Sequence, residues 1–268
     1  MPEAAGFQAY FFDLDGTIFL GDRLLPGVRE TLARLREQGK EMMFLSNTTT
    51  RTRTECLDKL RGLGLEASLD EVVTAAYMAA VYLSERSPAA NVLAIGEHAL
   101  CAELDERHVR RTTDPAEATH VLVGMDRRFD YGKIHLAMTA VRNGALLIAA
   151  NPDPYCPLDG DAVPDTWSMV KAIEAASEGT VQTVIGKPSA YYANKVLQWG
   201  NWRRGHCLMV GDRYETDMLL GIENGIPTAL VLTGVTSASD LERYPDEPDY
   251  AIGSLDELLA LQPRRYNG

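Results

Sequence analysis

The chain has 268 residues, of which 46% are hydrophobic and 24% are charged, so it holds enough apolar material for packed cores and shows no compositional sign of disorder. This length fits one large α/β domain or a core domain with an insertion. The formal net charge of -12 disfavours general attraction to nucleic acid or to anionic membranes, and we expect neither as a partner. An anionic ligand would need local positive charge instead.

Cysteine usage and the N-terminal segment bear on the cellular compartment. The four cysteines are scattered without a CxxC or similar ligand spacing, which argues against a zinc site and against a disulfide framework. The N-terminal segment lacks a basic region, and nowhere do about 18 uninterrupted apolar residues occur. We therefore expect a reduced, cytoplasmic setting without export or membrane insertion.

Short apolar runs with β-branched or aromatic residues recur along the chain and predict buried parallel strands. They cover residues 10–12, 42–45, 92–95, 121–123, 145–149, 208–210 and 229–232. Helical apolar spacing lies between them, as in residues 28–35 before Gly39 and residues 134–141 before Gly144. This alternation predicts an α/β fold with mainly parallel, Rossmann-like sheets, whose reactive residues gather beyond the carboxyl ends of the strands.

A segment in the middle of the chain repeats this alternation on its own. Residues 88–179 show a strand–helix–strand–helix pattern, and we expect them to form an inserted α/β lobe. The core is then expected to comprise residues 1–87 and 180–268. All four polar motifs that follow strands of the core lie outside the insertion.

Two carboxylates end the first predicted strand. Asp13 and Asp15 are two positions apart and can project toward one region, where Asp13 could attack phosphorus and Asp15 could act as general acid and base. Gly16 would allow a tight turn and a close approach to phosphate oxygens. The same run is also typical of a plain turn, or of the start of a calcium loop, but position 12 counted from Asp13 is Leu24 and not an acidic residue.

A hydroxyl and an amide follow the second predicted strand. Ser46 and Asn47 could hydrogen-bond a transferring phosphoryl group. They suit a helix N-cap equally well. The two interpretations are compatible, because the N-terminus of a helix is itself favourable for anions.

A single lysine stands between a late strand and a helix, in the run Gly-Lys-Pro-Ser at residues 186–189. Lys187 would neutralise the charge of a phosphate and of the nucleophile, and Pro188 suits a first helical turn. An isolated lysine is normally a solvated surface group. The run lacks the second glycine of a Walker loop, which argues against binding a nucleotide triphosphate by that route.

Two more carboxylates, Asp212 and Asp217, follow the next strand. Mg²⁺ prefers hard oxygen ligands, which could come from Asp13, Asp212 and the backbone carbonyl of Asp15, while water completes the shell. Asp217 could hold Lys187 or a metal-bound water, and an Asp N-cap is the alternative interpretation. Because four converging carboxylates would repel one another without a cation, their common placement predicts bound Mg²⁺.

These four motifs, in this order, resemble those of the haloacid dehalogenase (HAD) superfamily of aspartate-nucleophile phosphatases. The α/β insertion, together with Asn-Pro-Asp at residues 151–153, looks like the NagD and para-nitrophenylphosphatase branch with a C2-type cap, class IIA. The resemblance implies the roles described above and a cap that selects the leaving group. Asn151 and Asp153 are then candidates to face the substrate, although this run is also typical of a turn, and Trp167 could narrow the pocket.

The resemblance implies hydrolysis of a small phosphomonoester. We expect a sugar phosphate, glycerol phosphate, phosphoglycolate, nucleotide or pyridoxal phosphate as substrate and para-nitrophenyl phosphate as an artificial one. A phosphotransferase or mutase is an alternative, but related mutases typically carry a small helical cap. A sensor of a phosphorylated metabolite is another, and the presence of both Asp13 and Asp15 counts against it. Relatives with this cap frequently pair through it, so a homodimer is expected.

Overall fold

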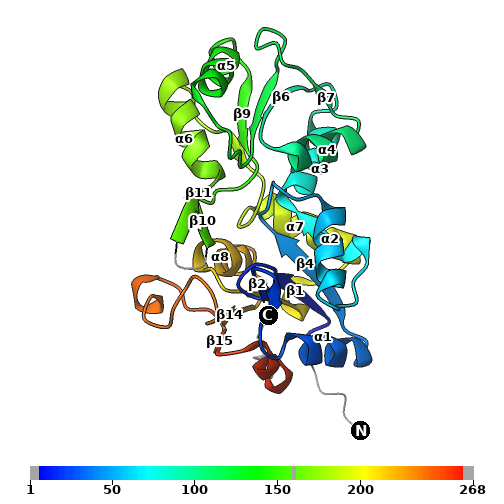
Figure 1. Ribbon diagram of the computed structural model, residues 1–268. Coiled ribbons are helices and arrows are strands. Elements are labelled where there is room, and N and C mark those ends of the chain that lie inside the picture. Colours follow the sequence, from blue (N-terminus) through cyan, green and yellow to red (C-terminus); the bar gives the residue numbers. More distant parts are fainter. Residues whose placement is uncertain (1–5, 159–160, 262–268) are drawn as a thin grey trace. The chain divides into compact units, whose positions relative to one another are not determined.

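The computed structural model describes residues 6–158 and 161–261, which form two compact units (Figure 1). The first unit comprises Met1–Ser46, Lys59–Val72 and Lys187–Gly268, and the second comprises Asn47–Asp58 and Val73–Gly186. These limits differ from the domain boundaries expected at 87/88 and 179/180, because residues 47–58, 73–87 and 180–186 group with the second unit. The ends of the expected core, residues 1–5 and 262–268, lie outside the described residues.

The first unit is built on a sheet with the strand order β15-β14-β13-β1-β4-β5. Its strands are β1 (Ala9–Asp13), β4 (Glu41–Ser46), β13 (Cys207–Gly211), β14 (Thr228–Val231), β15 (Tyr250–Ile252) and β5 (Val72–Thr74). The division between the units crosses β5 after Val72. From β15 to β4, each neighbouring pair is parallel. All five residues of β1 and of β13 are buried, which explains their almost continuous apolar sequence.

Helices connect the strands of this unit. They are α1 (Val28–Glu37), α2 (Arg53–Gly62), α7 (Ala190–Gly200) and α8 (Leu219–Ile222). The division between the units crosses α2, and one π-helical turn, Tyr214–Met218, precedes α8. The apolar stripe of α1 is buried as its spacing predicts, and Gly39, at φ +69°, follows its end. A short antiparallel hairpin, β2 (Phe19–Leu20) with β3 (Arg23–Leu24), follows β1.

The second unit has a parallel sheet of its own, with the order β12-β9-β8-β6-β7. The strands are β6 (Asn91–Ile95), β7 (Arg110–Arg111), β8 (His120–Val123), β9 (Leu146–Ala149) and β12 (Thr183–Val184). The helices are α3 (Ala75–Arg86), α4 (His98–Glu106), α5 (Tyr131–Arg142) and α6 (Thr166–Ser177). An antiparallel hairpin joins β10 (Tyr155–Leu158) to β11 (Asp161–Pro164).

The core of the second unit lies between its sheet and two helices. Figure 1 shows α5 and α6 on one side of this sheet and α3 and α4 on the other. Buried aliphatic residues of β6, β8 and β9 pack against α5 and α6 in one cluster. Asp130 caps α5 by accepting a hydrogen bond from the Lys133 amide at 2.9 Å, which fixes where this helix begins.

The α/β fold with parallel sheets is confirmed, and each of the seven predicted runs coincides with a strand to within one or two residues. The sequence did not reveal β7 and β15, which have two and three residues, because so few residues form no recognisable apolar run. The placement of Pro188 in a first helical turn is wrong. It precedes Ser189, whose hydroxyl caps α7 by accepting a hydrogen bond from the Tyr192 amide at 3.2 Å.

Within the described part of the chain, we find no helix with the length and apolarity that a membrane crossing requires.

Candidate active site

The polar motifs of the first unit meet at the carboxyl edge of its sheet. Strand β1 lies between β4 and β13, and the register pairs Phe12 with Phe44 on one side and with Val210 on the other. Parallel strands in register end at the same edge. Asp13 and Asp212, which come one and two residues after the paired positions of their strands, are therefore brought together although they are far apart in sequence.

Lys187 is the buried cation of this edge. Its ammonium lies 2.6 Å from Asp13 Oδ1 and 2.7 Å from Asp217 Oδ1. It also donates a hydrogen bond to the backbone carbonyl of Leu45 at 3.0 Å, so all three of its N–H groups have an acceptor. The side chain is only 1% exposed. The lysine is thus not a solvated surface group, and it ties the ends of β1 and β4 to the π-helical turn that follows β13.

Three carboxylates crowd around this ammonium. One oxygen each of Asp13, Asp212 and Asp217 lies within 4.8 Å of the others. When all three are ionised, Lys187 leaves two of their negative charges unbalanced. Burial keeps water from screening them, since Asp212 is 3% and Asp217 is 1% exposed. A cluster of hard oxygen donors with excess negative charge fits a divalent cation, so these residues could hold a metal.

Burial also governs the protonation of these groups. It raises the pKa of Asp13 well above the usual range for a carboxyl, with Lys187 acting in the opposite direction. Burial and the charge of Asp217 raise the pKa of Asp212 to about 7. Burial alone would lower the pKa of Lys187, but Asp13 and Asp217 raise it above its ordinary value. The lysine therefore stays charged, while the carboxyls favour either a proton or a cation.

Two glycines allow the backbone to pass directly against the Asp212 carboxylate. Gly16 has a φ of +92°, and a Cβ atom there would lie 2.4 Å from Asp212 Oδ2. A Cβ atom on Gly234 would lie 1.8 Å from the same oxygen. Any other residue would have to displace the carboxylate, and at Gly16 it would also be strained. The role of Gly16 in binding the substrate stays a prediction.

Asp15 and Ser46 complete the polar residues expected at this edge. Asp15 is exposed on the turn after β1, where it forms a single bridge with Phe19. Among the described side chains, its carboxylate does not belong to the group within 4.8 Å. Ser46 is 4% exposed and follows Leu45, the register partner of Asp13. The role of Asp15 in proton transfer and the role of Ser46 in binding phosphate stay predictions.

The remaining predicted substrate residues belong to the second unit and bond to one another. Asn47 donates its amide to Asp153 Oδ2 at 2.9 Å, and the Asn151 amide donates to the Asn47 carbonyl at 2.7 Å. The Asp153 N–H donates to Asn151 Oδ1 at 3.0 Å, a hydrogen bond that closes an Asx turn. The turn interpretation of Asn-Pro-Asp is therefore correct, and contact of these residues with a substrate stays a prediction.

Trp167 lies close to this turn. Its backbone N–H donates to the Asp153 carbonyl at 3.0 Å, and its side chain packs against the core of the second unit. The Lys171 ammonium lies 4.6 Å from the centre of the indole ring, in cation–π geometry. These contacts give Trp167 a packing role, and its narrowing of a pocket stays a prediction.

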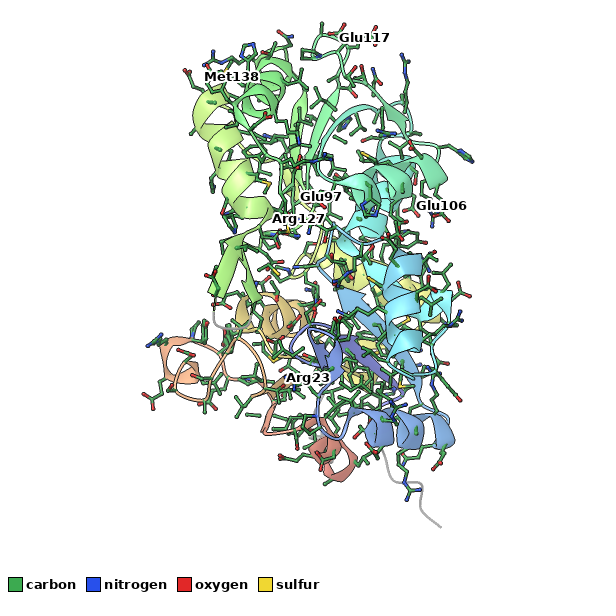
Figure 2. The ribbon with its side chains drawn as sticks, viewed as in Figure 1. Arg23, Glu97, Glu106, Glu117, Arg127 and Met138 are labelled. Atoms are coloured by element: carbon green, nitrogen blue, oxygen red, sulfur yellow. The ribbon has the colours of Figure 1, made fainter. Side chains whose placement is uncertain are left out.

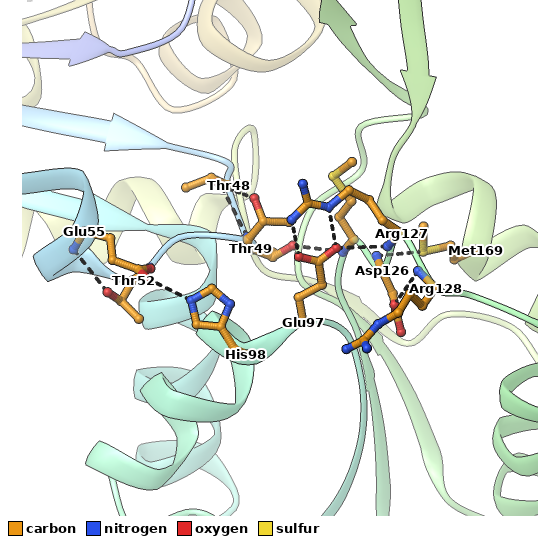
Figure 3. A network of polar contacts seen from close by, with 12 residues as sticks. Thr48, Thr49, Thr52, Glu55, Glu97, His98, Asp126, Arg127, Arg128 and Met169 are labelled. Atoms are coloured by element: carbon orange, nitrogen blue, oxygen red, sulfur yellow. Dashed lines mark hydrogen bonds and ion pairs between the residues drawn. The ribbon is translucent and has the colours of Figure 1, made fainter. Parts of the chain in front are cut away.

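The carboxyl edge of the second sheet carries ion pairs that the sequence did not single out. Glu97 follows β6 and accepts two hydrogen bonds from the Arg127 guanidinium, at 2.7 and 2.6 Å (Figures 2 and 3). Asp126 follows β8, is 2% exposed and pairs with Lys133. The Arg128 amide donates to the same carboxylate at 2.9 Å. Each of these two acids therefore has its own cation.

Sequence reasoning missed the loop after β14. Residues 233–236 contact both Gly16 and Asp212, although they carry no charged side chain. The signal was available, because the predicted strand at residues 229–232 ends at the same edge of the same sheet. Thr233 and Gly234 carry no charge, so the sequence indicates their place at the site only once the order of the strands is known.

Models of known families match both ends of the chain. A haloacid dehalogenase-like hydrolase model matches residues 10–110, and a HAD-hydrolase-like model matches residues 184–258. Together these segments include Asp13, Ser46, Lys187 and Asp212.

Individual relatives match over almost the full length. An acid sugar phosphatase of Staphylococcus epidermidis is 33% identical over 254 residues, which cover 95% of this chain and 97% of the relative. Among solved structures, the p-nitrophenyl phosphatase of Archaeoglobus fulgidus has a TM-score of 0.90 at 32% identity, and covers 96% of this chain and 100% of its own. NagD from E. coli has a TM-score of 0.86 at 26% identity, with 94% and 98% covered.

Proposed function

The chain belongs to the haloacid dehalogenase-like hydrolases, as a phosphatase of their NagD and para-nitrophenylphosphatase-like branch, and on this premise we propose that it is an Mg²⁺-dependent phosphomonoesterase with Asp13 as nucleophile. The observation that carries the proposal is the contact of Lys187 with both Asp13 and Asp217, beside Asp212. Such a cluster combines a nucleophile, a fixed positive charge and oxygen donors at one strand end.

The covalent step follows from the chemistry of these groups. An Asp13 carboxylate oxygen attacks phosphorus, and the bond from phosphorus to the leaving oxygen breaks while Asp15 gives that oxygen a proton. Asp15 then takes a proton from water, whose oxygen attacks the aspartyl-phosphate. Inorganic phosphate leaves and the Asp13 carboxylate is restored. Lys187, at 2.6 Å from Asp13 Oδ1, holds the nucleophile in place and favours its ionised form.

Asp13, Asp212 and the backbone carbonyl of Asp15 would hold the magnesium ion. When bound, the cation supplies positive charge that offsets the carboxylates and the phosphate of the substrate. Asp217 is engaged elsewhere, because its Oδ1 accepts from Lys187 at 2.7 Å and its Oδ2 accepts from the Arg213 amide at 3.1 Å. We therefore assign Asp217 to holding the lysine and not to direct metal binding.

The substrate class we propose is a small phosphorylated metabolite, with sugar phosphates first. The support is the name of the curated relatives, acid sugar phosphatase, together with their near-complete coverage of this chain. Glycerol phosphate, phosphoglycolate, nucleotides and pyridoxal phosphate stay in the panel to be tested. A cytoplasmic setting and pairing through the second unit complete the proposal.

The test is release of inorganic phosphate from this panel and from para-nitrophenyl phosphate, with Mg²⁺ or with a chelator. We expect release only with Mg²⁺, and we expect Asp13→Asn to lower kcat by about 10⁴-fold or more because it removes the nucleophile. Asp22→Asn, at an exposed carboxylate of the hairpin turn, is the matched control and should behave as the parent. Mass spectrometry of the acid-quenched parent should find a phosphoryl group on Asp13.

Two results would count against the proposal. Parent-like turnover by the Asp13→Asn variant would exclude covalent catalysis at this position. Absence of phosphate release by the parent from every compound of the panel would reject the phosphatase activity itself.

A further inference from the structure

The loop at residues 233–236, named the 233–236 loop, contacts two residues of the candidate cation site, Gly16 and Asp212. The Val235 N–H donates to Asp212 Oδ2 at 2.7 Å, and the Thr236 N–H donates to the Asp212 carbonyl at 3.0 Å. The Thr233 hydroxyl donates to the carbonyl of Gly16 at 2.7 Å. One short loop therefore binds both the acid of β13 and the turn that follows β1.

Two backbone segments pack against the Asp212 carboxylate as a result. Gly16 and Gly234 both lie so close that a Cβ atom on either would lie 2.4 Å or less from Oδ2. The amide hydrogen bond also engages Oδ2, so Oδ1 is the oxygen that we infer to be offered to a cation. A carboxylate with one oxygen fixed in this way has little rotational freedom left to lose when it binds a metal.

The π-helical turn that carries Asp217 anchors both the loop and the segment that follows it. The rings of Tyr214 and Tyr244 stack with centroids 3.7 Å apart and planes 9° from parallel. The Tyr214 N–H donates to the Thr236 hydroxyl at 2.9 Å, and the Tyr214 hydroxyl donates to the Asp246 carbonyl at 2.7 Å. Thr236 is 3% exposed. The loop is thus held by buried contacts and not only by its two ends.

We propose that the 233–236 loop is a positioning element of the cation site, in which the Thr233 hydroxyl fixes the Gly16 turn while the Gly234–Val235 backbone fixes the Asp212 carboxylate. Thr233 does not touch the reacting atoms, so it is a positioning residue. Removal of a group that orients a metal ligand typically weakens metal binding by about 10- to 100-fold. The inference rests on the proposed function, because it assumes that Asp212 holds Mg²⁺.

Titration calorimetry of Mg²⁺ into the metal-free protein tests this directly, without turnover. We expect Thr233→Val to raise the dissociation constant about 10-fold and Thr233→Ser, which keeps the hydroxyl, to bind as the parent does. Gly234→Ala should weaken binding further, since its Cβ would collide with Asp212 Oδ2. Gly205→Ala is the matched control, because a Cβ there meets nothing within 4 Å.

A kinetic measurement separates positioning from a general loss of structure. For Thr233→Val, the Mg²⁺ concentration that gives half-maximal activity should rise, while kcat at saturating Mg²⁺ stays within about 2- to 3-fold of the parent because a uniform binding loss spares the chemical step. Unchanged Mg²⁺ binding in both Thr233→Val and Gly234→Ala would overturn this inference alone. A parent that binds no Mg²⁺ would instead overturn the cofactor of the proposed function, and the inference with it.

Discussion

The carboxyl edges of the two parallel sheets hold charged groups in opposite arrangements. At the edge of the first sheet, three aspartates crowd around the single buried ammonium of Lys187. At the edge of the second sheet, Glu97 pairs with Arg127 and Asp126 pairs with Lys133. Both sheets have the same strand–helix architecture, so the fold alone does not decide which edge is reactive.

The pKa shifts follow this difference in charge balance. Burial raises the pKa of Asp212 to about 7, whereas hydrogen bonds from Arg127 lower the pKa of Glu97 to about 2. An acid with its own cation is stabilised in its charged form and has a structural use. Acids that outnumber their cations are costly unless a ligand compensates them, which makes the first edge the candidate active site.

The largest expected effect is the loss of stability when Lys187, compared with Lys133, is replaced. In a chelator, Lys187→Met should lower the free energy of unfolding by about 3–5 kcal/mol, because it leaves buried carboxylates without their cation. Lys133→Met should cost less, about 1–2 kcal/mol, since Lys133 is 33% exposed and the Arg128 amide still bonds to Asp126 in the variant. Urea unfolding followed by circular dichroism measures both values.

Mg²⁺ sharpens this comparison further. A divalent cation at the first edge should recover part of the stability lost in Lys187→Met and none of that lost in Lys133→Met. Equal losses for the two variants, with or without Mg²⁺, would contradict the difference in charge balance between the edges.

An effect of intermediate size is expected in how stability and Mg²⁺ affinity depend on pH. Because the pKa of Asp212 is raised from 3.8 to about 7, its contribution to the stability of the cation-free protein is fully present below about pH 4 and is lost as the pH rises through about 7. A proton on Asp212 competes with the cation. Calorimetry should therefore show Mg²⁺ affinity rising by up to about 10-fold per pH unit below 7 and levelling off above it.

An Mg²⁺ affinity that is independent of pH between 5 and 8, an interval that spans the value of about 7, would mean that Asp212 does not carry the displaced proton. Asp22→Asn provides the control, because its carboxylate is exposed on the hairpin turn and should leave the pH profile unchanged.

The smallest effect is expected at the second edge. Glu97→Gln should lower the free energy of unfolding by less than about 1 kcal/mol, because the Arg127 side chain is largely exposed and salt screens the pair. The pKa of Glu97 is lowered from 4.5 to about 2, so the contribution of this pair is present above pH 4.5 and is lost as the pH falls toward 2.

Melting temperatures of parent and variant at several pH values check the expectation for Glu97. The two proteins should differ at neutral pH in low salt and converge in acid. A difference that grows as the pH falls would show that the pair does not act through the charge of Glu97.

The sequence predicted most of the candidate site because strand-end motifs are local signals. Asp13, Ser46 and Asp212 each follow a buried apolar run, and a parallel sheet brings such positions to one edge. Lys187 was harder to interpret, since only its 1% exposure shows that it is buried. The 233–236 loop was missed because its contacts with Asp212 are made by backbone N–H groups, which leave no trace in residue type.

By itself, the sequence determined the α/β class, the alternation of strands and helices, and the residues able to supply a nucleophile, a positive charge and metal ligands. These follow from periodicity and side-chain chemistry, which are properties of short segments. Only the tertiary structure decided that Asp217 holds Lys187, that two glycines pack against Asp212, and that Asn47 bonds to Asp153. These contacts join positions far apart in the chain, and the order and register of the strands set them.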